Sequence, residues 1–513
     1  MTAALIAQTT ARFVGPSIDW YRLSPMLILL GGGMLLLVGS ALMRDRWPRG
    51  AFAIVSVGAA SAAGVLAAFL WHDVDKSGSR SLVGGALSLD RFSVFLTIVV
   101  CVSAALTSLF LDDFLRREGL DGPEVHALVL LSAVGGVVMV MSSDLIVLFL
   151  GLETLSIALY VLAGSHLRRL DSQESAIKYF VLGGFSSAFF LYGIALIYGA
   201  TGSTNLSAIA NYLSSTTILR DGRGLLTAGF ALLLVGLAFK IAAAPFHTWT
   251  PDVYQGAPSP VTGFMASASK AAAFGALLRV FVVAFASQRS DWRPVLFALA
   301  ILTLIVGSVL AVVQTNVKRM LAYSSISHAG FILVGVTAAS ARGVSGSLFY
   351  LLTYAVMVLG TFGVITVAGR SGDDDHSLDA YKGLGKRRPV LALAFTTFLL
   401  AQAGVPFTSG FWAKAGVIGA AVDAAGDKSD TFSYGWALAI VAMVCAAIAA
   451  YLYLRIVKTM YFDEPDADAT RPRIPLSAGI ALGLAMAFTL VIGVVPSLVV
   501  DMARHAVPTL AGR

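Results

Sequence analysis

The chain is poor in charged residues. Asp, Glu, Lys and Arg make up 13% of its 513 residues, whereas a soluble domain carries about 25%. Hydrophobic residues make up 57%, and the mean hydropathy is +0.82. These values exclude an ordinary soluble domain and favour a polytopic membrane protein. In such a protein, the excess of 36 basic over 29 acidic residues indicates basic loops on one side of the membrane rather than nucleic-acid binding.

Cysteine is also scarce. Cys101 and Cys445 each lie in an apolar run, and no CxxC spacing occurs. This excludes a disulfide framework, a structural metal site and an iron–sulfur cluster. The chain has no Walker motif and no nicotinamide or flavin loop, because its GGGM stretch at Gly31 lies inside an apolar run. The N-terminus has no basic segment before its apolar stretch, so we expect no cleaved signal peptide.

Long apolar runs dominate the sequence. A spanning helix needs about 20 mostly apolar residues, and fourteen runs meet that need, of which the seventh and twelfth contain Pro245 and Pro406. The predicted spans lie near 24–43, 51–71, 91–111, 125–142, 144–163, 174–198, 225–245, 258–285, 294–313, 320–339, 345–369, 389–423, 434–457 and 474–499.

Basic residues set the orientation of these spans. The short loops after odd-numbered spans hold more Lys and Arg than the other loops. Basic short loops face the cytoplasm, so both termini are predicted on the outer, periplasmic side.

Two segments between spans also carry a pattern. Residues 205–214 (NLSAIANYLS) have the apolar spacing of a helix, which we expect at the outer interface of the membrane. Residues 372–380 (GDDDHSLDA) contain several metal-ligand residue types, but a solvated cytoplasmic loop is the favoured interpretation over a metal site.

Six ionisable residues fall inside the predicted spans. A charge at mid-bilayer costs about 2.5–3.5 kcal/mol on insertion scales, so such residues are expected to face the bundle interior, pair with each other or line hydrated cavities. They usually mark ion pathways or proton relays. The set is Glu153, Lys178, Lys240, Lys270, His328 and Lys414.

Some of these charges have simpler interpretations. Lys178 lies near the predicted cytoplasmic end of its span and could extend its amine to the interface. For Arg279, near the outer end of the eighth span, extension of the guanidinium to the interface is the favoured interpretation. Glu153 and Lys240 could form a static salt bridge. His328 could be a polar residue satisfied between helices.

The two prolines suggest an internal repeat. A spanning helix is broken only where its freed backbone groups meet water, side chains or other helices. Broken helices at corresponding places in two halves are typical of inverted repeats with a site near the midplane. We therefore expect an all-α membrane protein with helices 1–3 in residues 1–124, two inverted five-helix repeats in 125–285 and 294–457, and helix 14 in 474–513.

Two motifs resemble a known family. Residues 245–274 (PFHTWTPDVYQGAPSPVTGFMASASKAAAF) and 316–335 (NVKRMLAYSSISHAGFILVG) are similar to the signatures of the antiporter-like subunits of respiratory complex I. The resemblance covers most of the chain, from about the fourth to the thirteenth span. A lysine in the second half of span twelve, and an end soon after span fourteen, favour the subunit N type (mitochondrial subunit 2).

The resemblance implies a proton-pumping role and assigns parts to residues. Glu153 matches the glutamate that pairs with the span-seven lysine, here Lys240. Lys270 matches the central lysine of span eight, and Lys414 the span-twelve lysine linked to proton exit. In addition, Lys178 matches an accessory lysine, and His328 lies in the span-ten motif as a connecting group.

The resemblance also implies where the redox chemistry lies. No cofactor is expected in this chain; FMN, iron–sulfur clusters and quinone are expected in partner subunits of an NADH-quinone oxidoreductase. The expected partners are neighbouring antiporter-like and small membrane subunits in a bacterial plasma membrane. A subunit of a multi-subunit cation/proton antiporter or of a membrane-bound hydrogenase remains the alternative, and a solute carrier or a structural scaffold stays open.

Overall fold

The computed structural model describes residues 15, 17–43, 47, 48, 50–215, 220–369, 373, 375–426, 434–465 and 471–508. The N-terminal stretch considered as a signal peptide lies outside this part. Within it the chain is almost wholly helical, with one antiparallel hairpin of β1 (Arg80–Leu82) and β2 (Leu87–Leu89) that pairs Ser81 with Ser88.

The helices follow the apolar runs. The first eight are α1 Ser24–Met43, α2 Ala51–Ser77, α3 Arg91–Glu118, α4 Pro123–Met141, α5 Leu145–Ala163, α6 Leu170–Thr201, α7 Leu206–Ser215 and α8 Arg220–Ile241. The next six are α9 Trp249–Gly256, α10 Ser259–Phe264, α11 Lys270–Leu277, α12 Arg289–Val312, α13 Val317–Thr337 and α14 Ala341–Ala368. The last six are α15 Leu384–Arg387, α16 Pro389–Ala403, α17 Ser409–Gly426, α18 Gly435–Phe462, α19 Leu476–Val494 and α20 Ser497–His505. Short 3-10 turns are η1 Val83–Gly85, η4 Ala286–Gln288 and η5 Leu378–Tyr381. Two π-helical segments, η2 Met265–Ser269 and η3 Leu278–Ala284, flank α11.

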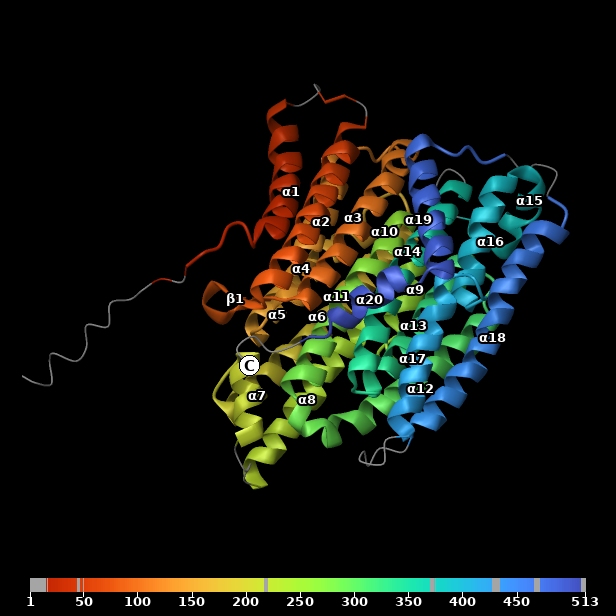
Figure 1. The fold of residues 1–513 in the computed structure, drawn as a ribbon. Helices are drawn as coiled ribbons and strands as arrows, with labels where there is room; N and C mark the ends of the chain where they lie inside the picture. The colour runs from red at the N-terminus through yellow and green to blue at the C-terminus, as the bar shows by residue number, and fades with distance from the viewer. Residues whose placement is uncertain are drawn as a thin grey trace, which may run out of the picture.

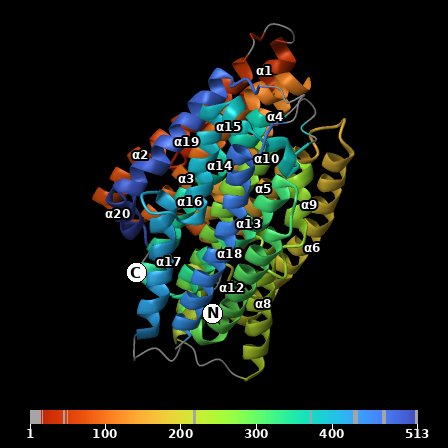
Figure 2. The ribbon, with the colours of Figure 1, turned by 90° about the vertical axis from the view of Figure 1, so that its right-hand side faces the viewer.

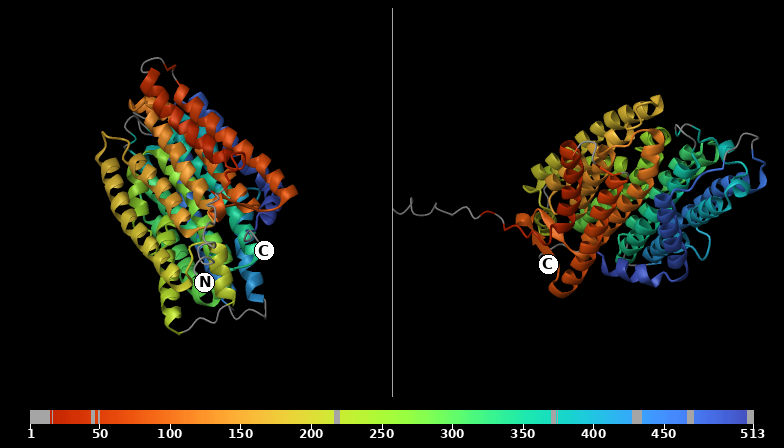
Figure 3. Two further views of the ribbon diagram at one scale, coloured as in Figure 1. Left: turned by 90° about the vertical axis from the view of Figure 1, so that its left-hand side faces the viewer. Right: turned by 90° about the horizontal axis from the view of Figure 1, so that it is seen from above.

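The long helices lie side by side in one bundle, with α1 and α2 at one end and α16–α18 at the other (Figure 1). The view from above shows the same separation of the N-terminal and C-terminal helices (Figure 3). The chain then returns, because α19 packs on α3 and α20 packs on α14 (Figure 2). Helices α13 and α14 lie at the centre of the bundle and are buried along almost their whole length.

The prediction of a polytopic membrane protein is confirmed. Thirteen helices in the described residues are long and apolar enough to cross a membrane. The twelfth predicted run is two helices, α16 and α17, on either side of Pro406, and the seventh is followed after Pro245 by α9. Residues 206–215 form a helix, α7. The inverted relation of the two five-helix units and the domain bounds stay predictions.

Two expectations about charged residues were wrong. Arg279 does not extend to an interface: it is 1% exposed and forms two hydrogen bonds of 2.9 Å with the carboxylate of Asp90. Asp90 also caps the start of α3 through Ser93. A buried guanidinium needs a partner, and the hairpin before α3 supplies one that lies far from Arg279 in the sequence.

The loop of residues 372–380 is not simply solvated. Asp373 and His376 are both buried, whereas Asp375 and Asp379 are exposed. The described residues contain no group of three or more His, Cys, Asp or Glu side chains that could hold a metal ion. Asp373 is turned inward against Lys318 and Arg169, away from the exposed Asp375 and Asp379.

Candidate functional site

Lys240 lies in the last turn of α8, and its buried side chain makes polar contacts. Its Nζ donates to Ser156 Oγ at 2.7 Å and to the Tyr179 hydroxyl at 3.2 Å. The amine also lies 5.9 Å and 5.4 Å from the ring centroids of Tyr160 and Tyr179, within reach of cation–π attraction. Lys240 therefore has neutral oxygen and aromatic partners from α5 and α6.

The backbone beside Lys240 is irregular but satisfied. The helix ends because Ala242 has a φ of +62° and Pro245 has no N–H to continue it. The carbonyl of Phe239 accepts hydrogen bonds of 3.0 Å from the Ala242 N–H and from the Trp249 indole, and Ala244 N–H donates to Thr303 Oγ1 at 3.0 Å. Side chains of α9 and α12 thus replace the missing helical bonds, as a break inside a membrane requires.

Glu153 lies one turn before Ser156 on α5 and is half-buried. Its carboxylate accepts a hydrogen bond from Ser187 Oγ, and within the described residues no ion pair joins it to Lys240. A cavity of about 10 Å³ lies beside Lys240 and is lined by Ser156, Ser187 and Lys240 among others. A cavity of this size has room for about one water molecule. Lys240 and Ser187, the hydrogen-bond partner of Glu153, therefore line one small cavity.

Lys270 lies deeper in the bundle, at the junction of η2 and α11. It is fully buried, and its Nζ donates to both the carbonyl and the hydroxyl oxygen of Ser325 on α13, each at 2.6 Å. The ring of Tyr354 lies 5.6 Å from the amine. π-helical turns often occur at functional sites, and here one directly precedes the lysine.

His328 is held by two phenols. Nδ1 is 2.6 Å from the Tyr350 hydroxyl and Nε2 is 3.1 Å from the Tyr453 hydroxyl. The Tyr453 hydroxyl in turn lies 2.6 Å from Ser324 Oγ. Because a neutral imidazole has one donor and one acceptor nitrogen, both ring nitrogens can be satisfied here. The interpretation of His328 as a satisfied polar residue and its role as a connecting group are both compatible with this geometry.

Lys414 bonds to the main chain at the second helix break. Its Nζ donates to the carbonyl of Ala403 at 2.8 Å, and the amine lies 4.8 Å from the Phe331 ring. Ala403 ends α16, and Gly404 follows with a φ of +91°, a conformation that glycine adopts without strain. The interruption near Pro406 thus exposes a main-chain acceptor for the lysine.

One side of α13 connects two of these lysines. Ser325, His328 and Phe331 follow at three-residue steps, a rise of about 9 Å, and contact Lys270, two tyrosines and Lys414 respectively. By contrast, no hydrogen bond among the described residues runs directly between the Lys240 group and the Lys270 group.

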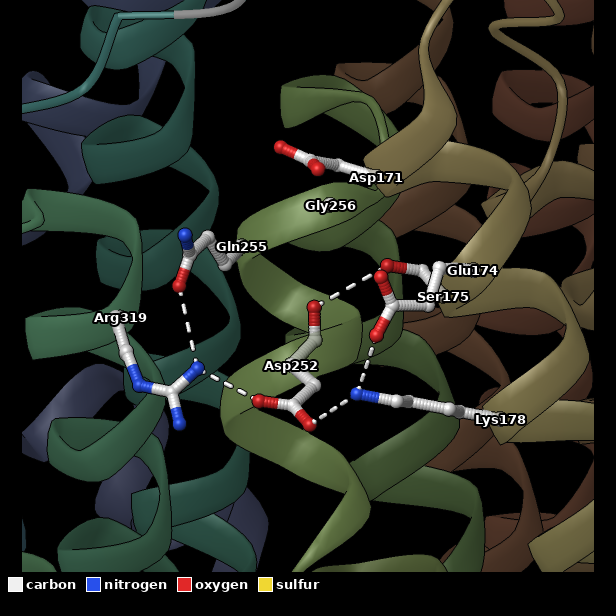
Figure 4. A pocket seen from close by; sticks show the side chains of 8 residues that line it. All are labelled: Asp171, Glu174, Ser175, Lys178, Asp252, Gln255, Gly256 and Arg319. Atoms are coloured by element: carbon white, nitrogen blue, oxygen red, sulfur yellow. Dashed lines mark hydrogen bonds and ion pairs between the residues drawn. The ribbon is translucent and has the colours of Figure 1, made fainter.

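Lys178 lies apart from this axis, at a pocket of about 100 Å³ at the start of α6 (Figure 4). Its side chain is 41% exposed and forms ion pairs with Asp252 at 2.8 Å and Glu174 at 2.6 Å. Asp252, on α9, also pairs with Arg319 of α13 at 2.6 Å. Partial burial raises the pKa of the Asp252 carboxyl, but the bonds from Lys178 and Arg319 outweigh it and hold the pKa below its usual value.

Several polar partners of the lysines were missing from the sequence-based set. Ser156, Tyr179 and Ser325 are common residue types in apolar runs, so nothing in their local sequence marks them. Asp252 could have been found, because it is an acid between two predicted spans within the motif that carries the family resemblance.

The fold and these buried lysines define an antiporter-like integral membrane protein. The family model of the NADH:quinone oxidoreductase/Mrp antiporter transmembrane region matches residues 142–434. Subunit N of NADH-quinone oxidoreductase from Mycobacterium tuberculosis is 40% identical over 96% of this chain and 99% of its own length. The Salinispora arenicola subunit N is 42% identical over 96% and 98%. The chain belongs to this family, in its subunit N branch.

Solved structures share the fold. A chain of respiratory complex I from Thermus thermophilus is 33% identical, with a TM-score of 0.77 over 94% of this chain and 99% of its own. A chain of the archaeal membrane-bound sulfane sulfur reductase is 27% identical, with a TM-score of 0.80 over 95% and 98%. A chain of the Mrp complex from Dietzia, 22% identical with a TM-score of 0.80 over 95% and 96%, shares the fold alone.

Proposed function

We propose that this chain is a proton-translocating membrane subunit of an NADH-quinone oxidoreductase (complex I) and moves protons along its buried polar residues. The relatives that cover its whole length carry that subunit's name. The proposed relay comprises Glu153, Lys178, Lys240, Lys270, His328 and Lys414.

The observation that carries the proposal is the kind of partner each buried lysine has. Lys240, Lys270 and Lys414 each donate to hydroxyl or carbonyl oxygens at 2.6–3.2 Å. A buried lysine paired with a carboxylate is held as a fixed ion, whereas these neutral partners allow the amine to gain and lose a proton. Proton transfer needs heavy-atom distances of about 2.6–3.2 Å or one bridging water. The hydroxyl contacts of Lys240 and Lys270 are within that range, whereas the carbonyl contacts position the amines, and transfer from Lys414 would need a bridging water.

Glu153 supplies the adjustable charge in this proposal. Its carboxylate bonds to Ser187 and acts on Lys240 electrostatically without a direct bond, so a change in its charge alters the field at the lysine without breaking a contact. The proton then passes to Lys270 and, along the side of α13 that holds His328, to Lys414. Each proton moved outward against 100 mV costs about 2.3 kcal/mol, which the redox chemistry of the complex would supply.

That redox chemistry belongs to partner subunits in our proposal, where FMN, iron–sulfur clusters and quinone would be bound. The chain would lie in a bacterial plasma membrane among other membrane subunits of complex I, with both termini on the periplasmic side. Lys178 and its pocket would then open to the cytoplasm, because α6 begins at that side.

The test is proton pumping by the assembled complex in sealed vesicles. Lys240→Ala and Glu153→Ala are each expected to lower NADH-driven pumping at least about tenfold, since a general acid–base group contributes about 10²–10⁴-fold. Lys386→Ala is the matched control, because this lysine is exposed and pairs only with exposed Glu464 among the described contacts. Normal turnover and pumping in both relay variants would reject the relay.

The alternative is a subunit of a multi-subunit cation/proton antiporter or a membrane-bound hydrogenase. It rests on the fold shared with the sulfane sulfur reductase chain. Co-purification in mild detergent separates the two, since only the complex I assignment predicts peripheral subunits that oxidise NADH.

A further inference from the structure

A fully buried carboxylate lies outside the proposed relay. Asp373, between α14 and η5, is 1% exposed. It accepts hydrogen bonds from Ser259 N–H at 3.2 Å and Ser259 Oγ at 2.9 Å, and from His376 Nε2 at 2.9 Å. Lys318 Nζ and Arg169 approach it at 3.5 Å and 3.4 Å. We name these five residues the Asp373 latch.

The latch joins segments that are distant in sequence. Arg169 directly precedes α6 and Ser259 begins α10, both in the predicted first five-helix unit. Lys318 lies in the first turn of α13, and Asp373 and His376 follow α14, all in the second unit. A buried charge is tolerated only when it is paired and hydrogen-bonded, so these segments are held together at this point.

The turn between α9 and α10 is held from two sides. Asp373 accepts the N–H of Ser259, while Lys318 Nζ donates to the carbonyl of Ala257 at 2.6 Å. Pro258, between the two, has no N–H of its own. The turn is the start of the 26-residue span 259–284, which carries Lys270.

The same span and α13 are joined at a second place. Lys270 bonds to Ser325, seven residues after Lys318 on α13, which is a rise of about 10 Å. Two helices connected at two separated places cannot slide or rotate past one another while both contacts hold. The latch therefore determines where Lys270 lies relative to its acceptors.

We propose that Asp373 is a positioning residue that holds the start of span 259–284 against α13, so that Lys270 stays within hydrogen-bond reach of Ser325. This inference rests on the proposed function of Lys270. Misplacing a reacting group by 1 Å can cost about 100-fold in rate. The burial of Asp373 raises the pKa of its carboxyl, but Lys318, His376 and Arg169 outweigh this and keep the carboxyl ionised.

The test compares variants in the assembled complex in vesicles. Asp373→Asn is expected to lower NADH-driven pumping at least about tenfold per assembled complex. Asp379→Asn is the matched control, because it makes the same change in the same loop at an exposed residue that pairs with Lys382. Asp373→Asn leaves Lys318 without its carboxylate, whereas Arg169 keeps Asp171 at 3.8 Å. The variant Asp373→Asn with Lys318→Met therefore removes one charge of each sign and is measured beside it.

Two further readouts separate positioning from a general loss of stability. Hydrogen exchange is expected to rise at the backbone amides of residues 257–264 and to stay unchanged in α1 and α2. The pH profile of pumping is also expected to differ from that of Asp379→Asn, because a displaced Lys270 has different partners. If the double variant assembles and pumps like Asp379→Asn with an unchanged pH profile, or if exchange rises uniformly, the proposal is overturned.

A parallel Lys270→Met variant tests the function on which this inference rests. Normal pumping by that variant would reject the role of Lys270 itself. Loss of pumping in Lys270→Met together with normal pumping in the Asp373 variants would reject the latch alone.

Discussion

The contact between Lys270 and Ser325 makes the sharpest test of the proposed relay. Ser325→Ala removes the hydroxyl acceptor but keeps the carbonyl acceptor, which belongs to the main chain. The side chain loses one oxygen and almost no volume, so α13 is expected to keep its packing. The substitution removes one of the two bonds that hold the amine, together with the hydroxyl's interactions with the phenols of Tyr254 and Tyr354.

The magnitude follows from the charge of the donor. A hydrogen bond to a charged group contributes about 1.5–3 kcal/mol, and about 1.4 kcal/mol corresponds to a tenfold change in rate. Ser325→Ala is thus expected to slow pumping by about tenfold to about a hundredfold. The remaining carbonyl keeps Lys270 near its place, which favours the lower end of that range.

The assay is dye-reported acidification by reconstituted complex, divided by the amount of assembled complex. Ser327→Ala is the control, because this serine lies on the same helix and bonds to Ser308 at 2.9 Å, away from Lys270. We expect it to pump normally. Equal rates for Ser325→Ala, Ser327→Ala and the unchanged protein would refute the argument that this bond carries the proton.

Two further predictions concern the ion pair of Arg279 with Asp90 and the ion pairs of Asp252 with Lys178 and Arg319. Arg279→Met leaves the buried Asp90 carboxylate without its cation and should destabilise the protein by about 3–5 kcal/mol. The double variant with Asp90→Asn should lose less stability, measured by thermal unfolding in detergent. An equal or larger loss in the double variant would contradict this. Asp252 has a folded-state pKa below its ordinary 3.8, so its stabilising effect is complete above about pH 4 and disappears as the pH falls through the lowered pKa. Asp252→Asn should therefore lose less stability than the unchanged protein as the pH falls from about 6 to about 3. If the free energies of unfolding of the two proteins fall in parallel over this range, the predicted direction is wrong.

Much of the fold could be predicted because hydropathy acts locally. A run of about 20 apolar residues has few alternatives to a spanning helix, and α1 has the bounds 24–43 that its run predicts. The helix ends near Pro245 and Pro406 follow from the missing N–H of proline. The burial of Lys240, Lys270 and Lys414 was also predictable, since the cost of exposing them to lipid depends on residue type alone.

The partners of those charges could not be predicted. Ser156 and Lys240 are 84 residues apart, and Lys270 and Ser325 are 55 apart. Which serine meets which lysine depends on how α5, α8, α11 and α13 pack, and many serines in apolar runs are equivalent by sequence. The expected partner of Lys240 illustrates the limit, because Glu153 bonds to Ser187 and forms no ion pair with Lys240 among the described residues.

The sequence by itself determined that this chain is a bundle of membrane helices with costly charges inside, because both properties are sums over local residue types. Only the tertiary structure decided what those charges do to one another. The sequence suggested a solvated Asp373 and an interfacial Arg279. In the structure Asp373 is buried at the centre of a group of ion pairs, and Arg279 is buried as the partner of Asp90. The physical reason is that pairing energy depends on distances of a few ångströms between residues that packing alone brings together.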